Sequence, residues 1–206
     1  MRNSPVPDIV VGRLPLYLRA LTQMQAEGKE ITSSQELGER LGISSAQIRK
    51  DLSQFGEFGK QGTGYNIGYL SEQLKSILKV DRVWDVILVG VGDLGRAVAN
   101  YAGFLDRGFK IHAVFDNNPE KIGKRAGEFS IRDASEIGSE IQSSDIQVAM
   151  LTVPSDQAQE VADQLVEAGI RAILCYAPTS INVPSSVRVQ YIDPVLHLQR
   201  MTYHVP

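Results

Sequence analysis

The chain has 206 residues, of which 43% are hydrophobic, and a formal net charge of −3 at pH 7. This length and apolar content allow one large or two modest globular domains, and the lack of any run of 18 apolar residues excludes a membrane-spanning helix. A single cysteine excludes an internal disulfide, and without a secretory signal pattern we expect a cytoplasmic protein.

The first part of the chain has the pattern of a helix-turn-helix. Residues 1–12 predict an irregular lead-in, and apolar residues at helical spacing then predict a helix from Leu14 to Glu27. Capping boxes at Ser33 and at Ser44 open two further helices, separated by a short turn. Residues 1–80 hold 10 Lys and Arg against 8 Asp and Glu, whereas residues 81–206 hold 11 against 16. The slightly basic first part permits contact with a polyanion without requiring it.

The third helix has a polar face suited to reading DNA. Ile48, Leu52 and Phe55 fall at i, i+4 and i+7, so they are expected in the core and the polar residues outside it. Arg pairs with guanine, Gln with adenine, and Lys or Ser with phosphate oxygens, which predicts contact with double-stranded DNA. An ordinary solvated helix face is the alternative. The predicted DNA-binding residues here are Ser45, Gln47, Arg49, Lys50, Ser53 and Gln54.

Residues 58–67 are punctuated by glycines between aromatic and β-branched residues, which predicts a small hairpin directly after the third helix. A hairpin in that place is a wing, and its glycines let the backbone approach a phosphate or a minor groove. We therefore predict that Lys60, Gly62 and Tyr65 also contact DNA. A short helix from Ser71 to Leu78 is expected to lead into the next domain.

The stretch that begins at Trp84 predicts a dinucleotide site. The apolar run Trp84–Val89 indicates a buried parallel strand, and Gly90, Gly92 and Gly95 follow it at the G-x-G-x-x-G spacing. The first glycine allows a tight turn, the second lets the backbone approach a pyrophosphate, and the third lets helix and strand pack closely. The phosphates would lie at the helix N-terminus.

A helix from Leu94 to Arg107 and a strand from Lys110 to Phe115 complete this unit. Asp116 then stands 21 positions after Gly95, about where a carboxylate holds the ribose 2′-OH of NAD and repels the 2′-phosphate of NADP. A glycine turn in an unrelated α/β protein is the alternative interpretation.

The remaining chain alternates strands and helices. Strands are expected over residues 146–153, 171–175 and 187–192, with helices from 134 to 141 and up to Gly169. This order predicts an α/β Rossmann domain, a doubly wound parallel sheet with its ligand crevice at the carboxyl ends of the strands. The predicted cofactor-binding residues are Gly90, Val91, Gly92, Asp93, Leu94, Gly95, Asp116, Thr152, Val153, Pro154, Ala177 and Pro178.

Pro194 opens a last helix, expected from Val195 to Tyr203. Its apolar residues Val195, Leu198 and Met201, with Thr202, share one face. Spacing alone leaves open whether this face packs on another subunit or on its own domain. Cys175, in an apolar strand, is expected to be a buried hydrophobic residue.

The run SAQIRKDLSQFGEFGKQGTGY, residues 45–65, closely resembles the Rex family of redox-sensing transcriptional repressors. The resemblance continues through GVGDLG (90–95), NYAGF (100–104), VFDNNPEKIG (114–123), LTVP (151–154), ILCYAP (173–178) and YIDPVLHLQRMTY (191–203). It covers nearly the whole chain. It implies a winged-helix DNA-binding domain over 1–80, a Rossmann NAD(H)-binding domain over 81–193 and a helix over 194–206 swapped onto the partner of a homodimer.

The resemblance further implies that the dimer binds an inverted-repeat operator and that NADH, in competition with NAD, releases it. It places Tyr101 and Asp193 near the nicotinamide, with Arg19 as a third polar partner of the switch. The chain departs from the usual family pattern at Gln61, Thr63, Cys175 and Pro194, where Arg, Val, Asn and Leu are common.

Two other functions compete with this interpretation. An NAD-dependent oxidoreductase needs a proton donor beside the ring, but His112, His197 and His204 are not convincingly placed, and no substrate domain remains. A sensor of CoA or another nucleotide is disfavoured by Asp116, because a carboxylate suits a free ribose hydroxyl. Three scattered His and one Cys form no metal-ligand spacing, so we expect neither an enzyme nor a metal site.

Overall fold

The computed structural model describes residues 6–60 and 63–205. The chain divides into two compact units that meet after Arg82, compared with residue 80 in the sequence prediction. The terminal residues 194–206 belong to the second unit. In the described part of the chain, no helix is long and apolar enough to cross a membrane.

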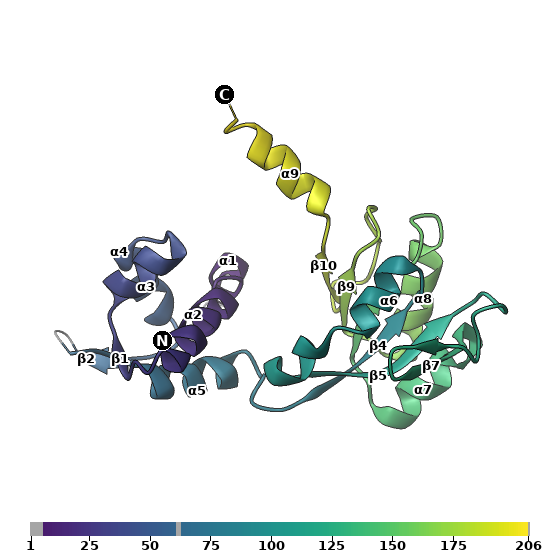
Figure 1. Ribbon diagram of the computed structural model, residues 1–206, viewed down its shortest axis with the longest axis horizontal. Helices are drawn as coiled ribbons and strands as arrows, with labels where there is room; N and C mark the ends of the chain where they lie inside the picture. Colours follow the sequence, from purple (N-terminus) through teal and green to yellow (C-terminus); the bar gives the residue numbers. More distant parts are fainter. Residues whose placement is uncertain (1–5, 61–62, 206) are drawn as a thin grey trace. The chain divides into compact units, whose positions relative to one another are not determined.

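The N-terminal unit consists of helices around one core and a small antiparallel sheet of order β1-β3-β2 (Figure 1). Its elements are α1 (Asp8–Val11), α2 (Leu14–Ala26), β1 (Ile31–Thr32), α3 (Ser34–Leu41), α4 (Ser45–Leu52), β2 (Gly59–Lys60), β3 (Gly64–Asn66) and α5 (Ile67–Ile77). Both predicted capping residues act as caps: Ser33 Oγ accepts a hydrogen bond from the Glu36 N–H and Ser44 Oγ from the Gln47 N–H. Ile48 and Leu52 lie in the core as predicted.

Two predictions for this unit were wrong. The lead-in contains helix α1, which begins directly after Pro7, a residue whose fixed φ suits the start of a helix. Helix α5 begins at Ile67 rather than Ser71, because the Asn66 side chain accepts a hydrogen bond from the Tyr69 N–H at 2.8 Å and caps it there. The hairpin is correspondingly shorter.

The second unit is a seven-stranded sheet of order β10-β9-β8-β4-β5-β7-β6, parallel except for the edge strand β6. The strands are β4 (Trp84–Val89), β5 (Phe109–Asp116), β6 (Arg125–Ala126), β7 (Phe129–Asp133), β8 (Val148–Leu151), β9 (Ala172–Cys175) and β10 (Arg188–Tyr191). The helices are α6 (Asp93–Ala99), η1 (Ala102–Arg107), η2 (Ala134–Glu136), α7 (Ile137–Ser144), α8 (Ala158–Ala168) and α9 (Pro194–Thr202).

Both faces of this sheet are covered, as the continuous apolar run of β4 predicts. Val86 and Leu88 point to the side of α6, whereas Ile87 and Val89 point to the side of α7 and α8. Cys175 is fully buried in the second of these layers, as expected. Strand β4, which leads into the glycine turn, is therefore packed on both of its faces.

The predicted helix from Leu94 to Arg107 is in fact two pieces. Helix α6 ends at Ala99, and after Asn100 and Tyr101 the chain continues as the 3-10 turn η1. The Asn100 side chain donates to the Arg96 carbonyl at 2.7 Å and so competes with the helical backbone. Three apolar residues of the stripe expected to be buried are exposed: Leu94, Tyr101 and Leu105 are 47%, 48% and 58% exposed.

The strands β6 and β7 were not predicted. They form a hairpin after β5, and β7 extends the sheet by pairing in parallel with β5, with Val114 opposite Ile131. Gly127 (φ +62°) turns this hairpin toward α6, where a Cβ on it would lie 2.7 Å from Asn100 Oδ1. These strands are too short and too polar to show the expected periodicity.

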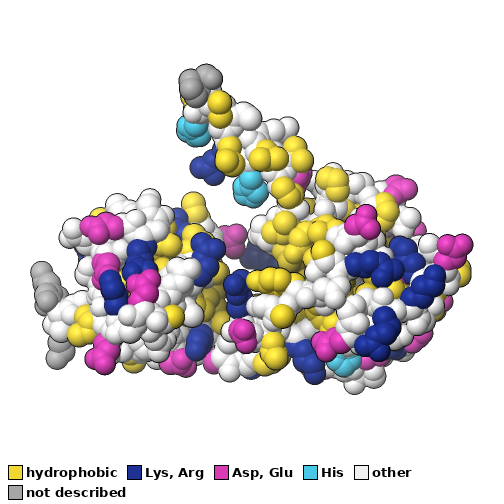
Figure 2. Space-filling view, viewed as in Figure 1, with side chains coloured by type: hydrophobic (Ala, Val, Ile, Leu, Met, Phe, Trp, Pro, Cys, Tyr) yellow, Lys and Arg dark blue, Asp and Glu magenta, His cyan; other side chains and the backbone are white. Residues whose placement is uncertain are grey.

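The terminal helix α9 is present as predicted, with both ends one residue earlier than the expected Val195 and Tyr203, and the Asp193 carboxylate caps it by accepting from the Val195 N–H at 2.9 Å. All nine residues of α9 are described, and none of them is buried. The helix leaves the sheet as a separate arm (Figure 1), and hydrophobic side chains are exposed along it (Figure 2). Its apolar face therefore does not dock on its own domain.

Candidate functional site

The candidate ligand crevice lies at the carboxyl end of β4. This strand pairs with β5 on one side and with β8 on the other, so the loops that follow β4 and β8 meet at the point where the strand order reverses. The Thr152 N–H donates to the Val89 carbonyl at 2.9 Å, and Thr152 Oγ1 donates to the Gly90 carbonyl at 2.6 Å. Thr152, expected to line the nicotinamide half, thus also fixes the glycine turn.

The three glycines of the turn have different surroundings. Gly90 has φ +94°, and a Cβ there would lie 2.8 Å from the Thr152 backbone. A Cβ on Gly95 would lie 2.0 Å from the Gly90 carbonyl oxygen. A Cβ on Gly92, in contrast, would meet nothing within 4 Å among the described residues. The first and third glycines are required by packing, and the second borders open space.

The open space beside Gly92 adjoins the start of α6. Helix α6 begins at Asp93, and in the described chain no side chain caps its first N–H groups. Such groups and the helix dipole favour an anion, and a side chain at Gly92 would obstruct its approach. Of the other sequence-predicted residues, Val91 lies in the same turn, and Asp93 and Leu94 are the first two residues of α6.

Asp116 ends β5 beside this turn and is only 5% exposed. Its Oδ2 accepts from the Val91 N–H at 2.7 Å and from Lys121 Nζ at 3.0 Å, and its Oδ1 accepts from the Asn118 N–H at 2.9 Å. Burial alone would raise the pKa of Asp116, but these donors outweigh it and hold the pKa below its usual value. The carboxylate is charged and is already tied to the glycine turn. Sequence reasoning missed Lys121.

The residues predicted around the nicotinamide are less uniformly placed. Pro154 and Pro178 are exposed just past the ends of β8 and β9, with Val153 half-buried beside them. Ala177 is buried in the layer of α7 and α8 and offers little surface to a ligand.

Of the three switch residues, Arg19 belongs to the first unit, and Tyr101 and Asp193 belong to the second. Tyr101 is exposed, with its ring edge-on to Phe104 at 5.0 Å. Asp193 is engaged as the cap of α9, and Arg19 is exposed on α2.

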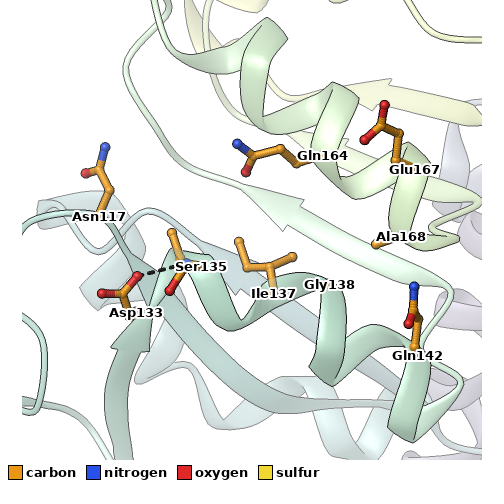
Figure 3. Close-up of a pocket in the computed structure, with 10 residues that line it drawn as sticks. Asn117, Asp133, Ser135, Ile137, Gly138, Gln142, Gln164, Glu167 and Ala168 are labelled. Atoms are coloured by element: carbon orange, nitrogen blue, oxygen red, sulfur yellow. Dashed lines mark hydrogen bonds between the residues drawn. The ribbon is translucent and has the colours of Figure 1, made fainter.

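A groove of about 670 Å³ opens between α7 and α8 (Figure 3). It starts beside Asn117, which follows Asp116, and mostly polar side chains such as Gln142, Gln164 and Glu167 line it. The Asp133 carboxylate at one end accepts from the Ser135 N–H at 2.8 Å. The sequence-predicted cofactor residues are not among those that line this groove.

Arg49 and Lys50 are exposed on α4, and Ser53 and Gln54 are exposed just past its end at Leu52, whereas Ser45 and Gln47 are half-buried. Arg49 donates to Ser34 Oγ at 2.9 Å, and Ser53 Oγ donates to the Lys50 carbonyl at 2.9 Å.

Gln47 is less free than expected. Its Nε2 donates to Asp51 Oδ1 at 2.7 Å, so half of the amide is already in use.

The wing is formed by β2 and β3, with Gly59 opposite Tyr65 and Lys60 opposite Gly64. Gly62 and Gln61 lie outside the described residues. Tyr65 packs partly against the core of the unit, and burial raises its pKa.

Sequence reasoning missed Asp51, the most tightly bonded side chain of this unit. Its carboxylate is fully buried and accepts hydrogen bonds from Arg13, Tyr17 and Gln47. The signal was present, because Asp51 stands at i+3 from Ile48 and so belongs to the buried stripe of α4. Among the residues that the structure describes, no group of three or more potential metal ligands occurs.

Comparison with known proteins covers both units. A family model for the N-terminus of DNA-binding proteins matches residues 5–53, and a model for the CoA binding domain matches residues 81–179. The redox-sensing transcriptional repressor Rex of Chloroflexus aggregans is 50% identical over 204 residues, which cover 99% of this chain and 96% of that protein.

Two solved structures are similar to nearly the whole chain. RSP in complex with beta-NAD+ and operator DNA is 36% identical, with a TM-score of 0.92 over 98% of this chain and 93% of that one. RSP in complex with beta-NADH is 34% identical, with a TM-score of 0.89 over 98% of this chain and 95% of that one.

Proposed function

The chain belongs to the Rex family of redox-sensing transcriptional repressors, and we propose that it binds an inverted-repeat operator as a homodimer that NADH releases. Members of this family are regulators of transcription rather than enzymes. The observation that carries the proposal is the pairing, in one chain, of a helix-turn-helix with a crevice whose open Gly92 and charged Asp116 suit a dinucleotide. We place the protein in the cytoplasm, where operator DNA and NAD(H) occur together.

The first N–H groups of α6, with Gly92 beneath them, would hold the pyrophosphate, and Asp116 would hold the adenosine ribose. A charged carboxylate supports NAD(H) over CoA or NADP(H), because those molecules carry a phosphate on that ribose. NADH and NAD share all these groups, so this half of the crevice cannot distinguish them.

Redox discrimination therefore has to come from the ring. NAD carries a positive pyridinium, which an apolar pocket disfavours, whereas the dihydronicotinamide of NADH is neutral. The residues proposed for this half are Thr152, Val153 and Pro154 after β8, with Ala177 and Pro178 after β9. Tyr101, Asp193 and Arg19 would exchange polar contacts between the two states.

DNA binding is assigned to the exposed face of α4 and to the wing. Arg49 and Lys50 are exposed on α4, and Ser53 and Gln54 are exposed in the turn that follows it, so all four are accessible to bases or phosphates. Ser45 and Gln47 at the start of α4, and Lys60, Gly62 and Tyr65 of the wing, complete the proposed surface.

The homodimer is supported by apolar surface that one chain leaves uncovered. All nine residues of α9 lack burial, and Leu94, Tyr101 and Leu105 of the second unit are exposed as well. Apolar residues exposed along a whole helix are typical of an interaction site. A second copy of the chain, in a two-fold arrangement, would cover it with its own α9.

The switch is tested by fluorescence anisotropy with an inverted-repeat duplex selected by the protein from a random pool. NADH should weaken operator binding and NAD should relieve the effect of NADH, while NADPH should do neither because Asp116 opposes its 2′-phosphate. A near-complete switch requires NADH to prefer the released state by about 5.5 kcal/mol. Unchanged operator affinity in NADH, or release by NAD as effective as by NADH, would contradict the proposal.

A further inference from the structure

The carboxylate of Asp51 is fully buried on the recognition helix α4, where an unpaired charge would be costly. Oδ2 accepts from Arg13 Nε and Tyr17 Oη, both at 2.6 Å, and Oδ1 accepts from Arg13 Nη2 and Gln47 Nε2, both at 2.7 Å. A carboxylate offers about four acceptor positions, so Asp51 is completely satisfied. Burial alone would raise its pKa, but these donors hold the pKa below its usual value.

The donors come from two points on another helix. Arg13 is the N-cap residue of α2 and Tyr17 lies about one turn further along it. Arg13 binds through both arms of its planar guanidinium, a geometry that fixes angle as well as distance. The apolar contacts of Ile48 and Leu52 also hold α4 to the core, but such contacts are not directional.

A buried ion pair is a weak source of stability, because desolvation of both charges offsets their attraction. What the pair adds to the apolar core is a preferred orientation of α4 relative to α2. A rotation of α4 about its axis, or a slide along α2, would break the fork of Arg13 and the bond from Tyr17 together. Lys50 precedes Asp51 directly and Arg49 precedes Lys50, so the orientation of Asp51 sets that of both exposed cations.

We propose that Arg13 and Asp51 are positioning residues for operator recognition, which fix the rotation of α4 so that Arg49 and Lys50 meet the DNA. The inference rests on the proposed function. Asp51 itself cannot touch DNA because it is fully buried. Gln47 extends the network toward the surface, and with Nε2 held it presents only Oε1 to a base.

The decisive variant replaces both charges at once, as Arg13→Met with Asp51→Leu, in a chain that also carries Tyr17→Phe, so that neither a charge nor the buried Tyr17 hydroxyl is left unpaired. Replacing a buried pair by apolar residues is often neutral or stabilising, so thermal stability should be retained. Affinity for the selected operator should fall about tenfold or more, which corresponds to about 1.4 kcal/mol. Affinity for a scrambled duplex, which depends on phosphate charge alone, should not change, and neither should NADH affinity.

Two single variants distinguish the loss of orientation from the loss of a direct contact with DNA. Arg13→Lys keeps the charge but removes the fork, and it should lower operator affinity in the same selective way. Lys50→Ala removes a proposed direct contact, so it should weaken binding to operator and scrambled duplex alike and reduce the salt dependence by about one unit. A purely structural role for the pair would instead lower thermal stability and both DNA affinities together.

The outcomes separate the two proposals. If the unmodified chain binds operator and the double variant binds it as tightly and as selectively, the positioning role is overturned and the repressor function stands. Parallel loss of thermal stability and of both DNA affinities in Arg13→Lys and the double variant also overturns it. If the unmodified chain selects no operator, the repressor function itself fails and the positioning role fails with it.

Discussion

The carboxylate of Asp116 lies where the glycine turn meets the end of β5, and it holds the Val91 N–H before any ligand is present. In the proposed site, this one side chain both orders the loop and binds a ribose hydroxyl. Asp116→Ala should weaken NADH and NAD binding by the same factor, because the two share the adenosine ribose. A hydrogen bond to a charged group contributes about 1.5 to 3 kcal/mol, which predicts a loss of roughly 10- to 150-fold by calorimetry.

A matched control is Glu120→Ala, which removes an exposed carboxylate from the same loop. It should leave both affinities unchanged. If Asp116→Ala binds NADH as well as the unmodified chain does, another group holds the ribose.

Gly92 offers a cleaner probe of the same crevice. A Cβ there meets no described atom within 4 Å, so Gly92→Ala should change thermal stability by no more than about 0.5 kcal/mol. The added methyl group faces the proposed phosphate position, and affinity for NADH and NAD should fall about tenfold or more. Gly138→Ala on α7, also in open space, is the control that should bind normally. Unimpaired binding by Gly92→Ala would move the pyrophosphate elsewhere.

The role of a residue was predictable where its interaction partner is near in the sequence, or where a motif fixes the number of residues between them. The glycines follow β4 directly, and Asp116 stands at a set distance from them. Asp51 was not predictable in the same way, because Arg13 lies 38 positions away and a polar residue on a polar helix is normally solvated. Lys121 was missed because only the folded turn brings it to Asp116.

At the scale of elements, strong periodicity gave reliable predictions and local competition did not. Strand β4 has the predicted bounds Trp84–Val89, because four consecutive apolar residues, 86–89, form most of it. Helix α6 ends early because Asn100 bonds to its own helix, a contact that no apolar pattern reveals. The hairpin of β6 and β7 is too short to show a period, yet it supplies the strand next to β5.

The terminal helix tests the homodimer. Ending the chain at Asp193 removes α9 and with it the apolar face that a partner would cover, so sedimentation should show monomers or aggregates in place of dimers. Operator binding should weaken as well, because two half-sites would no longer be held by one assembly. Ending the chain at Tyr203 instead removes residues beyond α9 and should leave the dimer intact. A stable dimer without α9 would contradict the exchange of this helix.

For the whole molecule, the order of elements sufficed to predict a winged helix followed by a doubly wound sheet. The alternation of strand and helix fixes such a sheet because parallel strands need crossovers. The join between the two units follows Arg82, close to the point where the composition changes.

The two ligands of such a molecule are linked thermodynamically. If NADH weakens operator binding by a given factor, operator must weaken NADH binding by the same factor. A large number of operator sites in the cell would therefore raise the NADH concentration at which half of the repressor is released from DNA. The sensor and its targets set the response together.

The solvent-exposed arm formed by α9 has a further consequence for how much of the repressor is folded. A nine-residue helix on its own is marginal in water, and all nine residues of α9 lack burial within the chain. In the proposed homodimer, the stability of α9 would depend on the concentration of chains, because contacts with a second copy form by mass action. In that homodimer, copy number would act as a second input beside the NADH/NAD ratio, because dilution would melt the arm before it unfolded the domains. A newly made subunit would thus remain incompletely ordered until it encounters another.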